Sequence, residues 1–377
     1  MRYGWLVALL FGACSDSDPA VDSGDVAVDS DDAAVDSGDA AVDAGDVAGD
    51  SGDVAVDSDD VAVDSSDVAK ARCELPPGSL VSLPADDARH VAATEWFYWT
   101  GHLKAEDGRW FGFHITVVVV GAPGIGAMIG HHSLTRGDPG SGPDYRHGFE
   151  AGLEKGIPDD GFAFDLDDLV VSGFDGHDKL RSRLDGATLD LDVVDHRGPV
   201  ARHGSGFKDY GGGISTYSYA RPRMSARGTL DIDGEHLAVT GSVWFDHQWG
   251  ALAPPDVSRW DWIAIQLEDG RDIMVVQIPT PDGIAGEAEL SRPDCSMAYF
   301  DADQVGFNGT AFWQSPSSGC TYPMDWQVTV GDEVFDLTPL ADDQEMHADP
   351  IPYWEGAATV SGSATGRAYV ELVGYCH

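Results

Sequence analysis

Residues 110–120 read Trp-Phe-Gly-Phe-His-Ile-Thr-Val-Val-Val-Val. This run is rich in β-branched and aromatic residues, which fit the pleated, half-buried surface of a strand. A second run, Leu189-Asp-Leu-Asp-Val193, alternates strictly between apolar and charged side chains, as a strand with one buried face does. Helical periodicity is almost absent after Cys73, so these runs predict a β-rich fold.

Turn signals separate the predicted strands. Asp-Gly pairs occur at 107–108, 185–186, 233–234 and 269–270, and this pair favours hairpin turns because it tolerates positive φ angles. Many short strands joined by tight turns predict an antiparallel barrel or sandwich. The 305 residues from Cys73 onward exceed one ordinary domain. We therefore predict an all-β protein of two units, residues 73–252 and 253–377, with Pro254-Pro255 near the junction.

The first residues predict an export signal. Arg2 precedes an apolar run from Trp5 to Phe11 that is too short to span a bilayer as a helix, and Gly12-Ala13-Cys14 follows. Small residues before a cysteine are typical of a bacterial lipoprotein signal over residues 1–14, in which Cys14 is lipidated. Phe11 stands where that pattern prefers Leu, and a plain signal peptide is the alternative. The favoured interpretation is an exported lipoprotein, anchored to a membrane at the periplasm, outer membrane or cell surface.

Residues 15–72 predict a disordered linker. Between Ser15 and Ala69 there are 18 Asp residues and no Lys, Arg, Leu or aromatic residue, and residues 21–69 form seven heptads such as Val-Asp-Ser-Gly-Asp-Val-Ala. These heptads lack the large apolar residues of a coiled coil, and no unit carries the closing Glu of an EF-hand calcium loop. Like charges along the segment repel one another, which favours an extended tether.

The remainder of the chain is also acidic. The formal net charge is −43, and removing the 18 linker Asp residues and Arg2 leaves −26 on residues 70–377. A negative field of this size repels phosphate backbones, so we expect no nucleic-acid partner.

Cysteine usage agrees with export. With Cys14 lipidated, Cys73, Cys295, Cys320 and Cys376 remain, an even number that predicts disulfides in an oxidising compartment. Four cysteines allow three pairings. As a hypothesis, Cys295 with Cys320 would close a local loop and Cys73 with Cys376 would join the ends of the ordered region. No cysteine spacing is typical of a zinc site, so no metal is predicted.

Three clusters mix aromatic and ionisable residues: Glu95-Trp96-Phe97-Tyr98, Trp244-Phe245-Asp246-His247-Gln248-Trp249-Gly250 and Trp260-Asp261-Trp262. Because alternate strand residues share a face, Asp246 and His247 are expected on opposite faces, and Asp261 faces away from its Trp neighbours. An acid in an aromatic cavity would have the raised pKa that general acid catalysis requires. The competing interpretation is structural: the aromatics anchor cores and the acids bond backbone amides.

These motifs carry a family resemblance. The order of Glu95–Tyr98, Phe245–Gly250, Trp260–Trp262 and Gly366–Tyr375 resembles the carotenoid 1,2-hydratase (AttH-like) family. Tyr217-Ser-Tyr219 and Tyr353-Trp-Glu-Gly356 are further landmarks, and the resemblance runs from about His90 to Tyr375. It implies two lipocalin-like β units with an apolar cavity, and hydration of an isolated carbon–carbon double bond in an acyclic carotene. The predicted lipid anchor and tether fit an exported branch of the family better than a pigment-pathway enzyme.

The resemblance implies an elongated apolar ligand, such as an isoprenoid, polyene or lipid, that is hydrated or isomerised by acid catalysis without a cofactor. Asp246 or Asp261 is the expected acid, His247 would orient it or activate water, and Glu95 is a further catalytic candidate. Aromatic faces stabilise a carbocation, a role given to Tyr98, Trp249 and Trp260. Trp96, Trp262 and Tyr217 are the other expected substrate-binding residues.

Two alternatives remain at this stage. A non-catalytic carrier of lipid or another apolar metabolite at the outer membrane would use the same cavity, with the acid and histidine forming a structural network. A cell-surface binding module would instead expose an aromatic patch.

Overall fold

The computed structural model describes residues 72–137, 144–211, 213–251, 259–280, 283–347 and 352–376. Apart from two single-turn 3-10 helices, η1 (Ala85–Asp87) and η2 (Arg202–Gly204), every regular element in these ranges is a β-strand. The predicted all-β class is therefore confirmed. The predicted signal peptide, Cys14, nearly all of the linker and the Pro254-Pro255 junction lie outside the described residues. Within those residues, no helix has the length and apolar character needed to cross a membrane.

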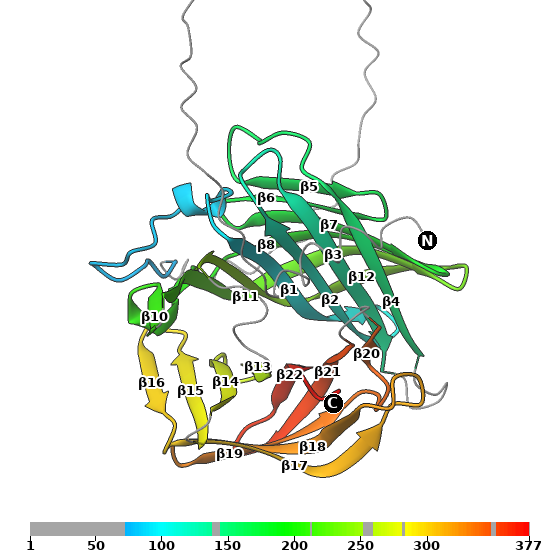
Figure 1. Cartoon of the computed structure of the whole chain (residues 1–377). Helices are drawn as coiled ribbons and strands as arrows, with labels where there is room; N and C mark the ends of the chain where they lie inside the picture. The colour runs from blue at the N-terminus through cyan, green and yellow to red at the C-terminus, as the bar shows by residue number, and fades with distance from the viewer. Residues whose placement is uncertain are drawn as a thin grey trace, which may run out of the picture. The chain divides into compact units, whose positions relative to one another are not determined.

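The strands form two antiparallel sheets (Figure 1). The first sheet contains β1 (Thr94–Ala105), β2 (Trp110–Val120), β3 (Ala127–Arg136), β4 (Asp144–Leu153), β5 (Phe162–Leu166), β6 (Leu169–Phe174), β7 (His177–Leu184), β8 (Ala187–Val194), β9 (Val200–Ala201), β10 (Phe207–Gly211), β11 (Ile214–Ile232) and β12 (Glu235–Ala251). The second contains β13 (Trp260–Leu267), β14 (Asp272–Thr280), β15 (Gly283–Ser291), β16 (Met297–Asp301), β17 (Val305–Gln314), β18 (Thr321–Val330), β19 (Glu333–Pro339), β20 (Glu345–Met346), β21 (Tyr353–Gly362) and β22 (Gly366–Val373).

Both sheets follow one plan. The strand order is β4-β3-β2-β1-β12-β11-β8-β7-β6-β5 in the first sheet and β16-β15-β14-β13-β22-β21-β19-β18-β17 in the second. In each sheet, the strand that comes first along the chain pairs with the strand that comes last, β1 with β12 and β13 with β22. Each sheet is therefore a meander whose final strand returns to its beginning, which is the pairing that curls an antiparallel sheet towards a barrel.

The local sequence patterns place the strands and turns as predicted. The run from Trp110 to Val120 is β2, and the alternating Leu189–Val193 lies in β8, where Leu189, Leu191 and Val193 are buried. The four Asp-Gly pairs named above connect neighbouring antiparallel strands, β1 to β2, β7 to β8, β11 to β12 and β13 to β14. At 233–234 both residues have positive φ, 52° and 84°, so this turn requires the pair.

Each sheet encloses its own core. In the first, inward-facing residues such as Phe97, Trp99, Phe113 and Phe245 belong to one buried cluster. In the second, Trp326, Trp354 and Phe335 belong to another. Interior-facing side chains thus fill the space inside each curved sheet.

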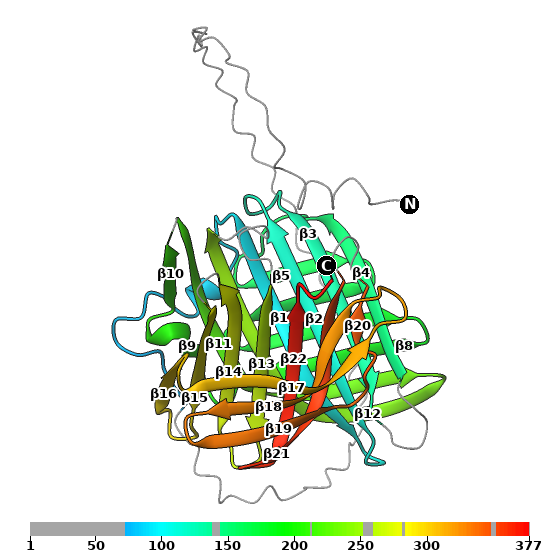
Figure 2. The ribbon, with the colours of Figure 1, turned by 60° about the horizontal axis from the view of Figure 1, so that its bottom comes forward.

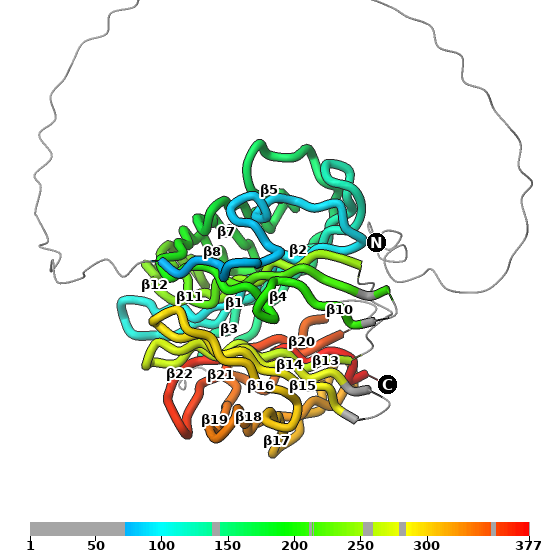
Figure 3. The backbone as a smooth tube through the Cα atoms, turned by 90° about the vertical axis from the view of Figure 1, so that its left-hand side faces the viewer, coloured from blue at the N-terminus to red at the C-terminus, as the bar shows by residue number. Residues whose placement is uncertain are grey.

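The outer face of β1, β2, β11 and β12 packs against the second sheet (Figures 1 and 2). A buried apolar cluster joins the two sheets, formed by Tyr98, Ala220, Trp244, Trp262, Ala264 and Met274. In the side view of Figure 3, the strands of the first sheet lie on one side and those of the second on the other. The backbones approach closely at Gly112 on β2, where a Cβ atom would lie 2.3 Å from the Cβ of Ala357 on β21.

This close approach gives a testable prediction. Gly112→Val should lower the free energy of unfolding by about 1–3 kcal/mol, because the added side chain overlaps Ala357 and overpacks the contact between the sheets. Urea denaturation measures the change. Gly112→Ala should cost less, and combining it with Ala357→Gly should recover part of that loss. A double variant no more stable than Gly112→Ala alone would show that the contact does not limit the packing.

The four cysteines among the described residues form two disulfides, but the pairing hypothesised from the sequence is wrong. Cys73 is joined to Cys295, and Cys320 to Cys376, with Cα–Cα distances of 5.5 and 4.7 Å. The backbone N–H of Cys73 donates to the Arg197 carbonyl at 2.7 Å, which fixes Cys73 beside the first sheet. There it meets Cys295, in the turn between β15 and β16. Spatial neighbours thus come from the packing of the two sheets, not from proximity along the chain.

Candidate functional site

Two rows of paired residues, one on each sheet, form the centre of the interface. In the first sheet, β2, β1, β12 and β11 contribute Thr116, Tyr98, Asp246 and Ala220. In the second, β14, β13, β22 and β21 contribute Val276, Trp262, Glu371 and Glu355. Paired residues in a ladder share a face, so each row presents its side chains together. The rows meet where Tyr98 contacts Trp262 edge to face, with ring centroids 5.1 Å apart.

Glu355 is the carboxyl group most completely enclosed by this interface. Its side chain is fully buried, and the Tyr98 hydroxyl donates to Oε1 at 2.8 Å. Oε2 has no hydrogen-bond partner among the described residues. Burial, followed by the nearby charge of Glu371, raises the pKa of Glu355 well above its ordinary value, although the bond from Tyr98 lowers it. Burial therefore favours the protonated, uncharged form of Glu355.

Two further carboxyl groups lie near it. Burial raises the pKa of Glu371 to about 7, opposed by a hydrogen bond that Trp260 Nε1 donates at 3.0 Å. Asp246 keeps 19% of its side chain exposed and lies 3.7 Å from the Arg202 guanidinium. Burial raises its pKa to about 6 and Arg202 opposes the change. The pKa of Asp246 is thus about 6 and that of Glu371 about 7, so both groups change protonation state close to neutral pH.

Histidine and tyrosine side chains extend the site along β2, β3 and β21. His131 Nδ1 lies 2.7 Å from the Tyr353 hydroxyl. Burial lowers the pKa of His131 to about 4 and that of His114 well below its ordinary value, so both rings are neutral at pH 7. Burial also raises the pKa of Tyr98 and Tyr353 well above the usual value. All of these groups are uncharged hydrogen-bond donors or acceptors in a desolvated setting.

The two cavities that border this interface are small. Each has a volume of about 10 Å³; Arg202, Trp244, Met274 and Glu289 line one, and His102, Trp244 and Tyr369 line the other. A volume of this size holds about one water molecule. An elongated ligand would therefore enter either of these cavities only if the sheets separated or their side chains rearranged.

A second polar cluster lies inside the first sheet, on the opposite face of β1. Glu95 is fully buried, and its Oε1 lies 2.7 Å from His247 Nε2 and 2.9 Å from His90 Nδ1. His90 stacks in parallel on Trp249, with ring centroids 3.8 Å apart. Trp249 in turn stacks on Tyr217 at 5.8 Å.

A family model described as AttH-like matches residues 74–375. The chain belongs to the AttH-like family. It is similar to the crystal structure of a putative AttH from Nitrosomonas europaea, with 29% identity, a TM-score of 0.71 and coverage of 81% of this chain and 100% of that one. Kievitone hydratase from Nectria haematococca shares the fold, with 18% identity, a TM-score of 0.64 and coverage of 78% and 93%. A comparison with curated proteins finds no match.

The AttH-like fold separates the residues that the sequence grouped into one site. Asp246 and His247 lie on opposite faces of β12, so His247 cannot orient Asp246, and the proposed pairing of these two residues is wrong. His247 instead contacts Glu95 inside the first sheet. Asp261 lies in neither place: it is buried and accepts a hydrogen bond of 2.7 Å from the Tyr375 hydroxyl, and burial raises its pKa.

The expected substrate-binding aromatics divide in the same way. Tyr98, Trp260 and Trp262 lie at the interface between the sheets, where they contact one another or Glu371. Trp96 is half-buried, and strand alternation places it on the face of Tyr98. Trp249 and Tyr217 lie inside the first sheet and cannot line the same ligand site.

Sequence reasoning missed Glu355 and Glu371. Both lie in segments that served as family landmarks, Tyr353–Gly356 and Gly366–Tyr375, without a functional role being given to them. The available signal was the only carboxylate of each strand, flanked on both sides by uncharged residues. A charge placed among core residues is rarely accidental, because burying it is costly.

Proposed function

We propose that this AttH-like protein protonates a carbon–carbon double bond of an apolar molecule, such as an isoprenoid or polyene, between the two sheets. The observation that carries the proposal is Glu355, a fully buried carboxyl group that accepts a hydrogen bond from Tyr98 and whose burial favours the protonated form. Protonating an isolated alkene requires an acid that still holds its proton at the working pH and that is shielded from water, and a buried, protonated carboxyl group meets that need.

The neighbouring residues suit the later steps. The proton passes from Glu355 to one alkene carbon, and the positive charge that forms on the adjacent carbon lies among the faces of Tyr98, Trp244 and Trp262. Glu371 then accepts a proton, either from the water that adds to the cation or from a neighbouring carbon. The first course yields an alcohol and the second a shifted double bond. In both, a proton moving from Glu371 to Glu355 restores the starting state.

Deuterium labelling tests this proposal. Purified full-length protein would be incubated with acyclic isoprenoid alkenes in deuterated water, and the extracts analysed by mass spectrometry. Hydration should give an alcohol with deuterium on carbon, and isomerisation should give an alkene that carries deuterium. An alkene that binds and is recovered unlabelled would overturn the enzyme proposal in favour of the carrier.

We also propose that the protein is exported and anchored through a lipid on Cys14. The support is the signal-like sequence before Cys14 together with two disulfides, which persist in oxidising compartments. Cys14→Ser should abolish incorporation of a labelled fatty acid and move the protein from the membrane fraction to the soluble fraction. Undiminished labelling of the variant would contradict the assignment.

A further inference from the structure

Two histidines and a glutamate converge inside the first sheet, away from the interface site. His90 follows η1, Glu95 lies on β1 and His247 on β12, and one potential ligand atom from each lies within 4.8 Å of the others. Nothing in the proposed alkene chemistry uses this cluster, because it lies on the opposite face of β1 from Tyr98. Glu95 and His247 are fully buried, whereas the His90 side chain keeps 19% of its surface exposed.

The three potential ligand atoms lie close together. Both imidazoles approach the same carboxylate oxygen, with His90 Nδ1 at 2.9 Å and His247 Nε2 at 2.7 Å from Glu95 Oε1. The other oxygen, Oε2, is held separately by the Arg89 guanidinium and by the backbone N–H of His90. The carboxylate is thereby fixed with Oε1 directed at the two rings.

The rings are held in place by their neighbours. His90 stacks on Trp249 with an interplanar angle of 1°, and His247 stacks on Phe97 with centroids 4.0 Å apart. The far nitrogen of His90, Nε2, lies 3.4 Å from Asp86 Oδ1. A carboxylate behind a histidine is the outer-sphere partner that orients metal-bound imidazoles in proteins.

The local charge also favours a cation. Arg89 contacts both Glu95 and Glu154, and Asp86 lies beside His90. Three carboxylates against one guanidinium leave a formal charge of −2 around neutral imidazoles, which one divalent ion would neutralise. Asp86 and His90 are partly exposed and give the ion a path from solvent.

We propose that His90, Glu95 and His247 form a binding site for one divalent transition-metal ion of the zinc type. Two imidazole nitrogens and one carboxylate oxygen suit Zn²⁺ and its neighbours, whereas Ca²⁺ and Mg²⁺ prefer all-oxygen sites. Three protein ligands would leave a fourth position for water or another ligand. The ion would join the loop after η1 to β1 and β12 and so stabilise this end of the sheet.

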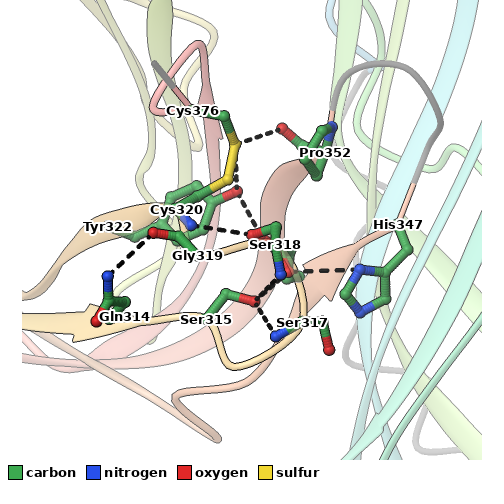
Figure 4. Close-up of a disulfide and its surroundings, with 11 residues drawn as sticks. Gln314, Ser315, Ser317, Ser318, Gly319, Cys320, Tyr322, His347, Pro352 and Cys376 are labelled. Atoms are coloured by element: carbon green, nitrogen blue, oxygen red, sulfur yellow. Dashed lines mark hydrogen bonds and ion pairs between the residues drawn. A yellow bond between two sulfur atoms is a disulfide. The ribbon is translucent and has the colours of Figure 1, made fainter.

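A second group of residues with potential metal-ligand atoms does not form an alternative metal site. Cys320, Glu345 and Cys376 lie close together, but both sulfurs belong to a disulfide, so neither offers a thiolate (Figure 4). Glu345 accepts hydrogen bonds there from Ser315, Ser318 and Tyr322.

The test uses the full chain without a histidine tag, titrated with Zn²⁺ by calorimetry and with Co²⁺ by visible absorption. Excess Mg²⁺ would occupy carboxylates of the Asp-rich segment before Lys70. We expect one Zn²⁺ per chain, a higher melting temperature with Zn²⁺, and a Co²⁺ spectrum typical of four or five ligands. His247→Gln and Glu95→Gln should each weaken Zn²⁺ binding by at least about 100-fold, and Asp86→Asn by about 10-fold.

The control is His132→Gln. His132 is equally buried and lies in the same sheet, but its Nδ1 is occupied by Ser182 Oγ at 2.7 Å. This variant should keep the affinity of the unchanged protein, and circular dichroism would confirm that each variant is folded. Absence of a one-to-one Zn²⁺ site, or equal affinity in folded His247→Gln and Glu95→Gln, would overturn the proposal.

Discussion

Replacing Arg221 with methionine is expected to lower the free energy of unfolding by about 3–5 kcal/mol. Arg221 lies on β11 with 1% of its surface exposed. Its guanidinium donates to Asp87 at 3.1 Å and to Asp195 at 2.8 Å. Methionine fills a similar volume but leaves both buried carboxylates without their counter-charge, so their desolvation is no longer offset. Urea denaturation followed by tryptophan fluorescence would measure the loss.

The matched control is Arg181→Met on β7 of the same sheet. Arg181 and Asp190 form an ion pair of 3.8 Å in which about half of each side chain is exposed, 49% and 58%. Exposed pairs of this kind contribute less than about 1 kcal/mol. Similar losses in the two variants would show that the buried network around Arg221 does not carry the stability assigned to it. Asp87 belongs to η1, so the same network fixes the loop that positions Arg89 and His90.

Strands and turns were predictable because their causes are local. The β-branched and aromatic composition of β2, the alternation in β8 and the positive φ angles at Asp233-Gly234 depend on adjacent residues alone. The family resemblance, carried by the order of the motifs, added the expectation of two similar β units. In the structure, each of these motifs lies on a strand at or near the interface between the two sheets.

The set of residues that forms the site was not predictable, because it depends on which faces of the two sheets pack against each other. Tyr98 and Glu355 are 257 residues apart and become neighbours only when the second sheet packs on the first. Strand alternation correctly placed Asp246 and His247 on opposite faces of β12, yet their adjacency in sequence suggested a shared role. The same limit explains the cysteine error, because Cys295 and Cys320 are close in sequence but belong to different pairs.

The second prediction with a large expected effect concerns the rate of the proposed reaction. Glu355→Gln should reduce the rate of deuterium incorporation into a labelled alkene by about 10²–10⁴-fold, because glutamine keeps the shape of the side chain but has no acidic proton to give. Glu333→Gln is the control: Glu333 lies on β19, pairs with Arg271 and is 35% exposed. Full activity in folded Glu355→Gln would remove Glu355 from the mechanism.

The pH dependence of the rate gives a further test, because partial unfolding of a variant would lower the rate without shifting its pH profile in the expected direction. The acid must be protonated, so the rate should fall as pH rises through the raised pKa of Glu355 in the folded protein. The Tyr98 hydroxyl stabilises the Glu355 carboxylate and lowers that pKa, whereas the charge of Glu371 raises it. Tyr98→Phe should therefore move the alkaline limb of the profile to higher pH. A shift to lower pH, or no shift, would show that a different group supplies the proton.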